Sequence, residues 1–126
     1  MPGDLATIAF EQVARAAVIR IDGEVDMSNA DRLLAELMAR VGIDPWLIVD
    51  LSACSYMDSA GLSVIAQVDG RCREVGSGLR LVVDPASGVE RVLAMTRLSE
   101  MLNVDRTLGE SIETAANETP DGGSAT

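Results

Sequence analysis

The chain has 126 residues, enough for one domain with a core of normal density. Its 20 acidic and 10 basic residues give a formal net charge of −10, which disfavours non-specific binding to nucleic acid and docking on anionic lipid. One Phe, one Trp and one Tyr are too few for a platform on which bases stack, so the core must be built from aliphatic residues and methionine.

The sequence gives no sign of export or of membrane insertion. The first fifteen residues include Asp4 and Glu11 and lack a basic start followed by an apolar run. No uncharged apolar stretch approaches the ~18 to 20 residues that a membrane helix needs. We therefore expect a cytoplasmic protein in which Cys54 and Cys72 are reduced thiols. Two cysteines alone make no metal site, and neither a metal nor another cofactor is expected.

The first third of the chain predicts a hairpin followed by a helix. Apolar residues alternate over residues 5–11 and 17–22, which predicts two strands with a short connection around 12–16. Residues 23–26 are expected to leave the second strand as a loop. Ser28-Asn29-Ala30-Asp31 resembles a capping box, and the apolar stripe that follows predicts a helix to about Val41, ended by Gly42.

The middle of the chain predicts a strand, a helix and a second strand. Residues 46–51 are the most strongly β-like run and predict a buried strand. A loop over 52–58 is expected to lead into a helix from Ser59 to about Val75. Gly76-Ser77-Gly78 ends this helix, and residues 79–83 predict the next strand.

The last third predicts two further helices. Capping boxes begin at Ser87 and Thr107, and they predict a short helix and a final helix to about Ala116. Between these helices, residues 98–102 predict a turn and Val104 begins a minor edge strand.

These elements predict an α/β fold over residues 5–116, with a small mixed sheet of four to five strands and about four helices. The two crossovers have the length of right-handed βαβ units. Residues 1–4 are expected to be a loose start, and the polar segment 117–126 a disordered tail. In such sheets the loops at the carboxyl ends of parallel strands gather ligands and partners, and Ser59 follows such an end.

Ser59 is the candidate functional residue. A serine at a helix start is suited to be the N-cap, and the small Ala60 and Gly61 leave its hydroxyl open. The amides of Gly61 and Leu62, with the helix dipole, are expected to support an added anion, and Asp58 supplies a charge beside it. The local interpretation is a modifiable serine at a strand-to-helix corner, and the alternative is a serine that only caps the helix.

Enzymatic chemistry finds little support in the sequence. The chain has no histidine, which excludes a Ser-His-Asp hydrolase, and Met57 stands where a nucleophile elbow needs glycine. The only G-x-G, at residues 76–78, follows a helix rather than a strand, so it does not indicate a phosphate loop. Asp26 belongs to an acidic loop that is expected at the same end of the sheet as Ser59. We do not expect an enzyme.

Several segments in this order resemble a known family, the bacterial STAS-domain anti-sigma factor antagonists, also called anti-anti-sigma factors. The resemblance covers roughly residues 5–116. It rests on Gly23-Glu24-Val25-Asp26, the helix from Ser28, the strand that ends in Asp50-Leu51, Met57-Asp58-Ser59-Ala60-Gly61-Leu62, Arg80-Leu81-Val82-Val83, Val89, Val92 and Leu93, and a closing helix.

The resemblance implies a regulator of transcription, with a mixed sheet whose helices pack mainly on one side. Such a protein binds an anti-sigma factor, a serine kinase of the GHKL type, and so frees a sigma factor, as in a stress response. The kinase phosphorylates the serine that corresponds to Ser59, the phosphorylated form lets go, and a PP2C-type phosphatase restores it. The partner-binding residues that the resemblance implies are Asp26, Met57, Asp58, Ala60, Gly61 and Leu62. Ala60 stands where other members have serine.

Three other interpretations remain open from the sequence. The domain could be a STAS scaffold without a switch, as a subunit of a transporter or of a larger signalling assembly. It could bind a nucleotide at the helix that begins at Ser59, although no basic residue lies near this serine in the sequence. Oxidation of Cys54, in the loop before Ser59, could also disturb partner docking.

Overall fold

A six-stranded sheet and five helices make up the described part of the chain, residues 6–120 of a computed structural model. The strands are β1 (Ala6–Val13), β2 (Ala16–Val25), β3 (Trp46–Asp50), β4 (Cys54–Met57), β5 (Gly78–Val82) and β6 (Asn103–Asp105). The helices are α1 (Ala30–Met38), α2 (Ser59–Val75), α3 (Gly88–Ala94), α4 (Leu98–Met101) and α5 (Leu108–Asn117). None of these helices is long and apolar enough to cross a membrane.

The sheet is mixed, as predicted. Its order is β1-β2-β3-β5-β6, with β1 antiparallel to β2 and the other pairs parallel. The ten-residue β2 is long enough to pair with two strands in succession. Its first half pairs with β3, and its last residues, Gly23 to Val25, pair with β4.

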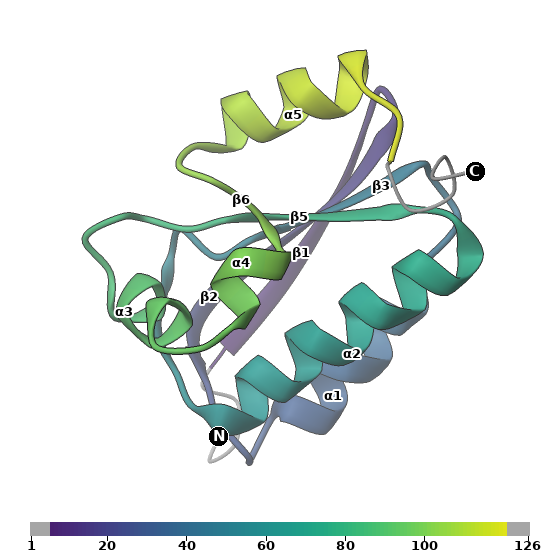
Figure 1. Ribbon diagram of the computed structural model, residues 1–126. Coiled ribbons are helices and arrows are strands. Elements are labelled where there is room, and N and C mark those ends of the chain that lie inside the picture. Colours follow the sequence, from purple (N-terminus) through teal and green to yellow (C-terminus); the bar gives the residue numbers. More distant parts are fainter. Residues whose placement is uncertain (1–5, 121–126) are drawn as a thin grey trace.

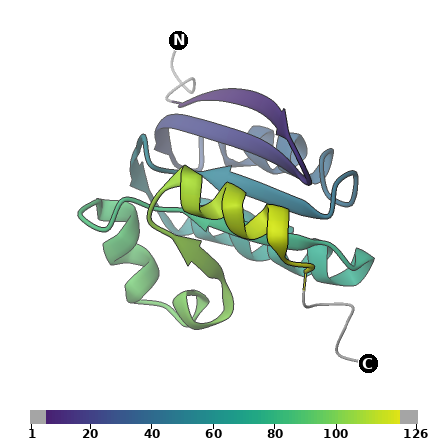
Figure 2. The same ribbon diagram turned by 90° about the horizontal axis from the view of Figure 1, so that it is seen from above.

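Helices cover both faces of the sheet, but four of the five pack on the same face (Figures 1 and 2). The alternation of side chains along each strand produces this arrangement. In β2, Ile19 and Ile21 face the large core under α1 to α4, whereas Ala16 and Val18 face the smaller cluster under α5. The expectation that helices lie mainly on one side is therefore confirmed, with α5 on the other.

One strand was missing from the sequence prediction. Residues 54–57 were expected to be loop and form β4, and β2 continues to Val25 instead of ending before Gly23. The backbone provides the reason, because the Gly23 N–H donates to the Ala53 carbonyl at 3.1 Å and the Asp58 N–H to the Val25 carbonyl at 3.2 Å. This pairing satisfies backbone groups at the end of β2 that would otherwise need another partner.

The start of α1 also differs from the prediction. The helix begins at Ala30, after Asn29, and Ser28 does not cap it. The hydroxyl and N–H of Ser28 both donate to the Asp26 carboxylate instead. The helix ends at Met38, and the turns that follow reach Gly42, whose φ of 84° lies in the left-handed region that favours glycine.

Helix α4 is a further difference, because residues 98–102 predicted a turn and Leu98–Met101 form a short helix. The remaining helix boundaries follow the sequence closely. Helix α2 spans Ser59–Val75 and ends at Gly76 with a φ of 78°, as predicted. The predicted caps of α3 and α5 are also confirmed. The Ser87 hydroxyl accepts from the Glu90 N–H at 3.2 Å, and the Thr107 hydroxyl from the Glu110 N–H at 3.1 Å.

The chain after α5 is held against the sheet as far as the structure describes it. The Trp46 indole N–H donates to the Glu118 carbonyl at 2.9 Å, and Pro120 is buried. Within the expected disordered tail, Asn117 ends α5, and the Glu118 carbonyl and Pro120 contact the domain, whereas the side chains of residues 117–119 are exposed. Residues 121–126 and the expected loose start, 1–4, lie outside the described residues.

Shortening the chain tests this docking, because Trp46 is the only tryptophan. A chain that ends at Asn117 loses the Glu118 carbonyl and Pro120, so we expect a red shift of tryptophan emission and a loss of about 1 kcal/mol in the free energy of unfolding. Urea titration followed by fluorescence measures both. A chain that ends at Pro120 is the control and should match the full chain. Equal emission and stability of all three would show that the contact has no effect.

Candidate functional site

The corner between β4 and α2 brings the predicted acidic residues together. Val25 of β2 lies opposite Met57 of β4 in a parallel pair, so the residues that follow them, Asp26 and Asp58, leave the same end of the sheet side by side. Ser59 is the first residue of α2 and is exposed. The two acidic residues that the sequence assigned to the serine thus lie at the same corner as the serine.

Asp58, and not Ser59, is the N-cap of α2. Its Oδ1 accepts hydrogen bonds from the Ala60 N–H at 2.9 Å and the Gly61 N–H at 3.2 Å. The backbone of Asp58 is extended, and an N-cap carboxylate also interacts favourably with the helix dipole. The expectation that Ser59 caps the helix is therefore wrong, and the Ser59 hydroxyl is left free of that role.

This cap also changes where an added anion could bind. The Gly61 amide is occupied by the Asp58 carboxylate, and the Leu62 N–H donates to the Asp58 backbone carbonyl at 3.1 Å. The expectation that the amides of Gly61 and Leu62 support an anion is therefore wrong for this conformation. A group attached to Ser59 would have to point away from the helix axis.

Two of the expected partner contacts are buried. Met57 is 1% exposed and packs in the main core, so the expectation that it meets a partner is wrong. Gly61 is buried against it, since a Cβ at this position would overlap Met57 Cγ and lie 3.0 Å from Val25 Cγ1. Met57 and Gly61 therefore pack beneath the surface of the corner and hold β4 and α2 together. Ala60 and Leu62 are half-buried and lie on the main core.

The turn between β2 and α1 forms the other wall of the corner. Asp26 Oδ1 accepts from the Ser28 N–H at 2.8 Å and from the Ser28 hydroxyl. These bonds, the hydroxyl first, lower the pKa of Asp26 below its ordinary value. Asn29 completes the turn, since its side chain accepts from the Asp26 N–H and donates to the Glu24 carbonyl.

This turn presents a residue that the sequence prediction missed. Met27 is 82% exposed, and the hydrogen bonds on both sides of it fix the turn on which it lies. An Asp-x-Ser sequence is typical of a turn closed by side-chain bonds to the backbone, and it is the signal from which this turn could have been found. The corner therefore combines an exposed apolar side chain with an exposed hydroxyl and two carboxylates.

The two cysteines are poorly placed for a redox role. Cys54 and Cys72 are both buried, and burial raises the pKa of each thiol above its ordinary value. Because the thiolate is the reactive form, this environment disfavours oxidation. The structure therefore lends no support to a redox switch at Cys54.

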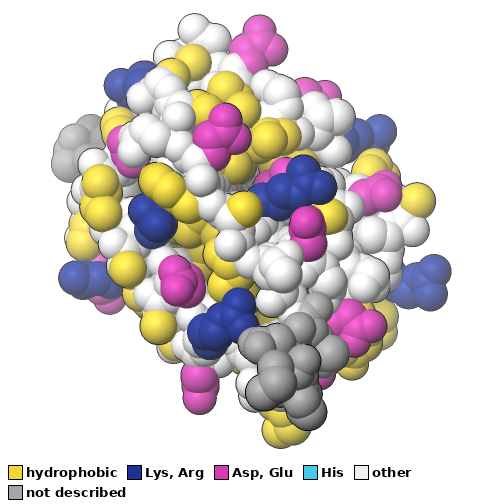
Figure 3. Space-filling model, turned by 180° about the vertical axis from the view of Figure 1, so that it is seen from behind, with side chains coloured by type: hydrophobic (Ala, Val, Ile, Leu, Met, Phe, Trp, Pro, Cys, Tyr) yellow, Lys and Arg dark blue, Asp and Glu magenta, His cyan; other side chains and the backbone are white. Residues whose placement is uncertain are grey.

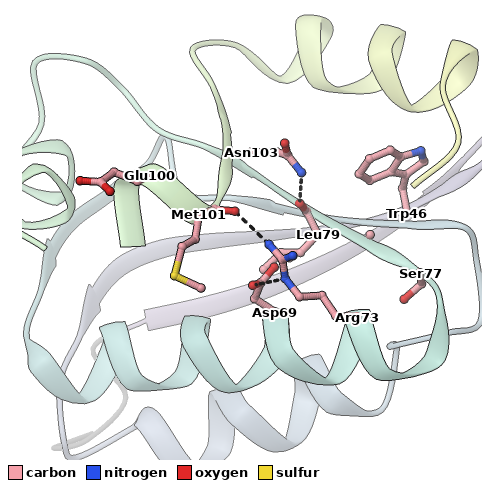
Figure 4. Close-up of a pocket in the computed structure, with 9 residues that line it drawn as sticks. Trp46, Asp69, Arg73, Ser77, Leu79, Glu100, Met101 and Asn103 are labelled. Atoms are coloured by element: carbon pink, nitrogen blue, oxygen red, sulfur yellow. Dashed lines mark hydrogen bonds and ion pairs between the residues drawn. The ribbon is translucent and has the colours of Figure 1, made fainter. Parts of the chain in front are cut away.

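A cavity of about 390 Å³ lies away from this corner, between the second half of α2, the start of β5 and α4 (Figure 4). Its lining contains Asp69, Glu100 and one guanidinium, that of Arg73. Arg73 already donates to Asp69 at 2.9 Å and to the Met101 carbonyl at 3.0 Å. Two carboxylates and a paired cation do not suit a phosphate group, so this cavity gives no support to nucleotide binding. Within residues 6–120, no cluster of three or more His, Cys, Asp or Glu side chains could hold a metal ion.

The close approach at Gly61 can be tested with a matched pair in the same helix. Gly61→Ala forces a methyl group onto Met57 and Val25, and we expect a loss of about 1 to 3 kcal/mol in the free energy of unfolding. At exposed Gly70 a Cβ meets no atom within 4 Å, so Gly70→Ala should stabilise the helix by roughly 0.5 to 1 kcal/mol. Urea titration measures both. A Gly61→Ala protein as stable as the wild type would contradict the packing described.

The hydrogen bonds to Asp26 predict a measurable pKa change. Ser28→Ala removes the hydroxyl donor, so the pKa of Asp26 should rise toward its ordinary value of 3.8. Because the folded pKa is lowered, the associated stability is present above the unfolded pKa and is lost as the pH falls through the folded pKa. An NMR titration of the Asp26 carboxyl carbon gives the pKa directly. Ser63→Ala, on α2, should leave it unchanged.

Comparison with known proteins agrees with the fold described above. The sequence profile of the STAS domain matches residues 7–111. Osmosensory protein A of Mycobacterium tuberculosis is 36% identical over 73 residues, which are 56% of this chain and only 45% of that protein. The chain thus spans about half the length of this curated relative.

Solved structures share the fold over most of the chain. The crystal structure of an anti-sigma factor antagonist from Mycobacterium paratuberculosis is 28% identical, with a TM-score of 0.80 over 94% of this chain and 98% of that one. The Bacillus cell fate determinant SpoIIAA in its phosphorylated form is 22% identical, with a TM-score of 0.63 over 85% of this chain and 97% of that one, which shows the fold alone. With a profile that matches most of its length and a fold to accompany it, the chain belongs to the STAS domain family.

Proposed function

We propose that this STAS domain is an anti-sigma factor antagonist that is switched by phosphorylation of Ser59. In its unphosphorylated form it binds an anti-sigma factor, a serine kinase of the GHKL type, and so releases a sigma factor. Phosphorylation by this kinase ends the binding, and a PP2C-type phosphatase restores it. The similarity to the mycobacterial anti-sigma factor antagonist supports the role, and the exposed, unbonded hydroxyl of Ser59 is the observation that carries the switch.

The hydrogen bonds of the nearby serines favour Ser59 as the phosphate acceptor. The Ser52 hydroxyl donates to Asp50, the Ser55 hydroxyl to the Gly23 carbonyl, and the Ser63 hydroxyl accepts from Gln67. Within the described part of the chain, the Ser59 hydroxyl makes no such bond. A kinase can therefore take up this hydroxyl without first breaking a contact of the domain.

The charges at the corner explain why a phosphate would weaken binding. A phosphoserine carries roughly −1.5 to −2 charges and three acceptor oxygens. Asp58 and Asp26 already place negative charge at this corner, and the Asp58 carboxylate occupies the first free amides of α2. The phosphate would thus face the partner, and burying it without a cation costs several kcal/mol. Since each ~1.4 kcal/mol is tenfold in affinity, a thousandfold loss is within reach.

The same arrangement lets the domain remain folded when it is modified. The stability of the α2 start rests on the Asp58 carboxylate and on the packing of Gly61, and neither involves the Ser59 hydroxyl. The switch therefore acts by repulsion at the interface and requires no large rearrangement of the domain.

Incubation with the cognate anti-sigma factor kinase and ATP, followed by mass mapping, tests the assignment. We expect phosphate on Ser59 only. Ser59→Ala should take no phosphate and bind the kinase as the wild type does, and Ser59→Glu should bind at least tenfold more weakly because it places a negative charge in the interface. Calorimetric titration measures the affinities.

Ser63 provides the matched control, because it is exposed and lies one turn further along α2. Ser63→Ala should still be phosphorylated, and Ser63→Glu should bind more tightly than Ser59→Glu. Phosphate on Ser52, Ser55 or Ser63, or an unchanged affinity of Ser59→Glu, would contradict the proposal. Purification with a transporter ATPase instead of a kinase would favour a scaffold without a switch.

A further inference from the structure

The two edge strands of the sheet, β1 and β6, differ in length, and the proposed switch at Ser59 does not involve this difference. Strand β6 has only three residues, whereas β1 has eight, from Ala6 to Val13, and pairs with β2 without a bulge. Edge strands are usually short, charged, bulged or interrupted by proline, because these features prevent pairing with another chain. Strand β1 carries one charge, Glu11, and no proline. Among residues 6–120, no other strand pairs with its outer side.

The hydrogen bonds of β2 determine which groups of β1 point outward. The Arg15 carbonyl accepts from the Trp46 N–H, so the odd-numbered residues of β2 bond toward β3 and the even-numbered ones toward β1. The even residues of β2 are opposite odd residues of β1. The N–H and carbonyl groups of Ile8, Phe10 and Gln12 are therefore directed to the free edge. The Ala6 carbonyl is consistent with this outward direction of the even-numbered residues, because it accepts from Arg32 of α1 and not from β2.

We propose that this edge pairs with the β1 edge of a second copy of the chain, antiparallel and in a register that places Phe10 opposite Phe10 on a two-fold axis. Ile8 then lies opposite Gln12 of the other copy, so each outward N–H faces an outward carbonyl. The two sheets join into one. Such a contact is self-complementary, as a two-fold dimer requires. The Ala6 carbonyl bound by Arg32 falls outside the paired stretch.

On the core face of β1, this register brings the two Phe10 side chains together and places Ile8 opposite Gln12. Phe10 is 43% exposed, although the Arg40 guanidinium lies over one face of its ring. Opposing aromatic side chains stabilise an antiparallel pair, and the contact would remove Phe10 from water. Figure 3 views the molecule from the side on which β1 lies, and apolar side chains are spread among charged ones across this face.

On the face of α5 the charges are complementary. Glu11 of one copy comes opposite Ala9 of the other, and Ala9 lies beside Arg20 in the pairing with β2. Because alanine is small, the Arg20 guanidinium can reach across it to the Glu11 carboxylate. Arg20 uses its Nε for Asp22, and its terminal amino groups remain for a second carboxylate. One strand thus supplies both the apolar and the charged partner, which favours a second copy over a foreign strand.

Analytical ultracentrifugation of the full chain, at up to about 1 mM protein and in about 0.15 M salt so that the net negative charge is screened, tests the proposal. We expect a reversible dimer of the 13.3 kDa chain. Phe10→Lys and Phe10→Glu should each be monomeric, because like charges meet on the axis. An equimolar mixture of the two should recover the dimer, because lysine then faces glutamate.

Controls separate this contact from other effects. Met95→Lys changes a residue that is 80% exposed but lies at the end of α3, away from β1, and it should leave the dimer intact. Glu11→Arg, which alters the other face, should raise the dimer dissociation constant at least tenfold. Circular dichroism verifies that each variant is folded. A monomeric wild type, dimeric Phe10→Lys, or a mixture that stays monomeric would overturn the proposal. Phosphorylation at Ser59 should be equal in wild type and Phe10→Lys, so the two proposals fail independently.

Discussion

The parallel pairing of the last residues of β2 with β4 is the constraint on which the corner depends. The hydrogen bond from the Asp58 N–H to the Val25 carbonyl fixes where β4 ends and hence where α2 begins. Once this point is fixed, the Asp58 carboxylate can reach the first amides of the helix, and Asp26 leaves the neighbouring strand beside it. The close packing of Gly61 on Met57 and Val25 holds the first turn of α2 against the same two strands. The position of Ser59 is thus a consequence of the pairing between β2 and β4 and of the glycine at position 61, which has no side chain to keep the helix away from these strands.

Neighbouring residues at this corner divide the structural and the chemical roles. Asp58 satisfies the helix amides, and Ser59 contributes its backbone to the first turn while its hydroxyl remains in solvent. An N-cap serine would have its hydroxyl engaged by the helix, and its modification would compete with the cap. The observed division leaves the hydroxyl available and makes the stability of the helix independent of it. Met27, on its fixed turn, adds an apolar group to the same surface.

Local signals were sufficient for much of the fold and insufficient for the details of the site. The bounds of α2, the caps at Ser87 and Thr107 and the short β6 follow from patterns within a few residues. Strand β4 did not, because Ser55 and Tyr56 interrupt its apolar pattern and its pairing with β2 joins segments about thirty residues apart. The cap was assigned to the wrong residue because Asp and Ser are about equally good N-caps, and only the register of β4 decides between them. The burial of Met57 depends on the same register.

Under the proposed function, the separation of the Asp58 cap from the Ser59 hydroxyl has a consequence for the evolution of the switch. Since folding places no demand on the hydroxyl, the codon for Ser59 can drift without any loss of a well-formed protein. Replacement of Ser59 by alanine would then yield a folded copy that, under the proposed function, cannot be released from its partner by phosphorylation. In a cell with duplicated genes for this domain, such a copy would, under the same proposal, hold the pathway on, and selection would have to act on signalling rather than on stability to remove it.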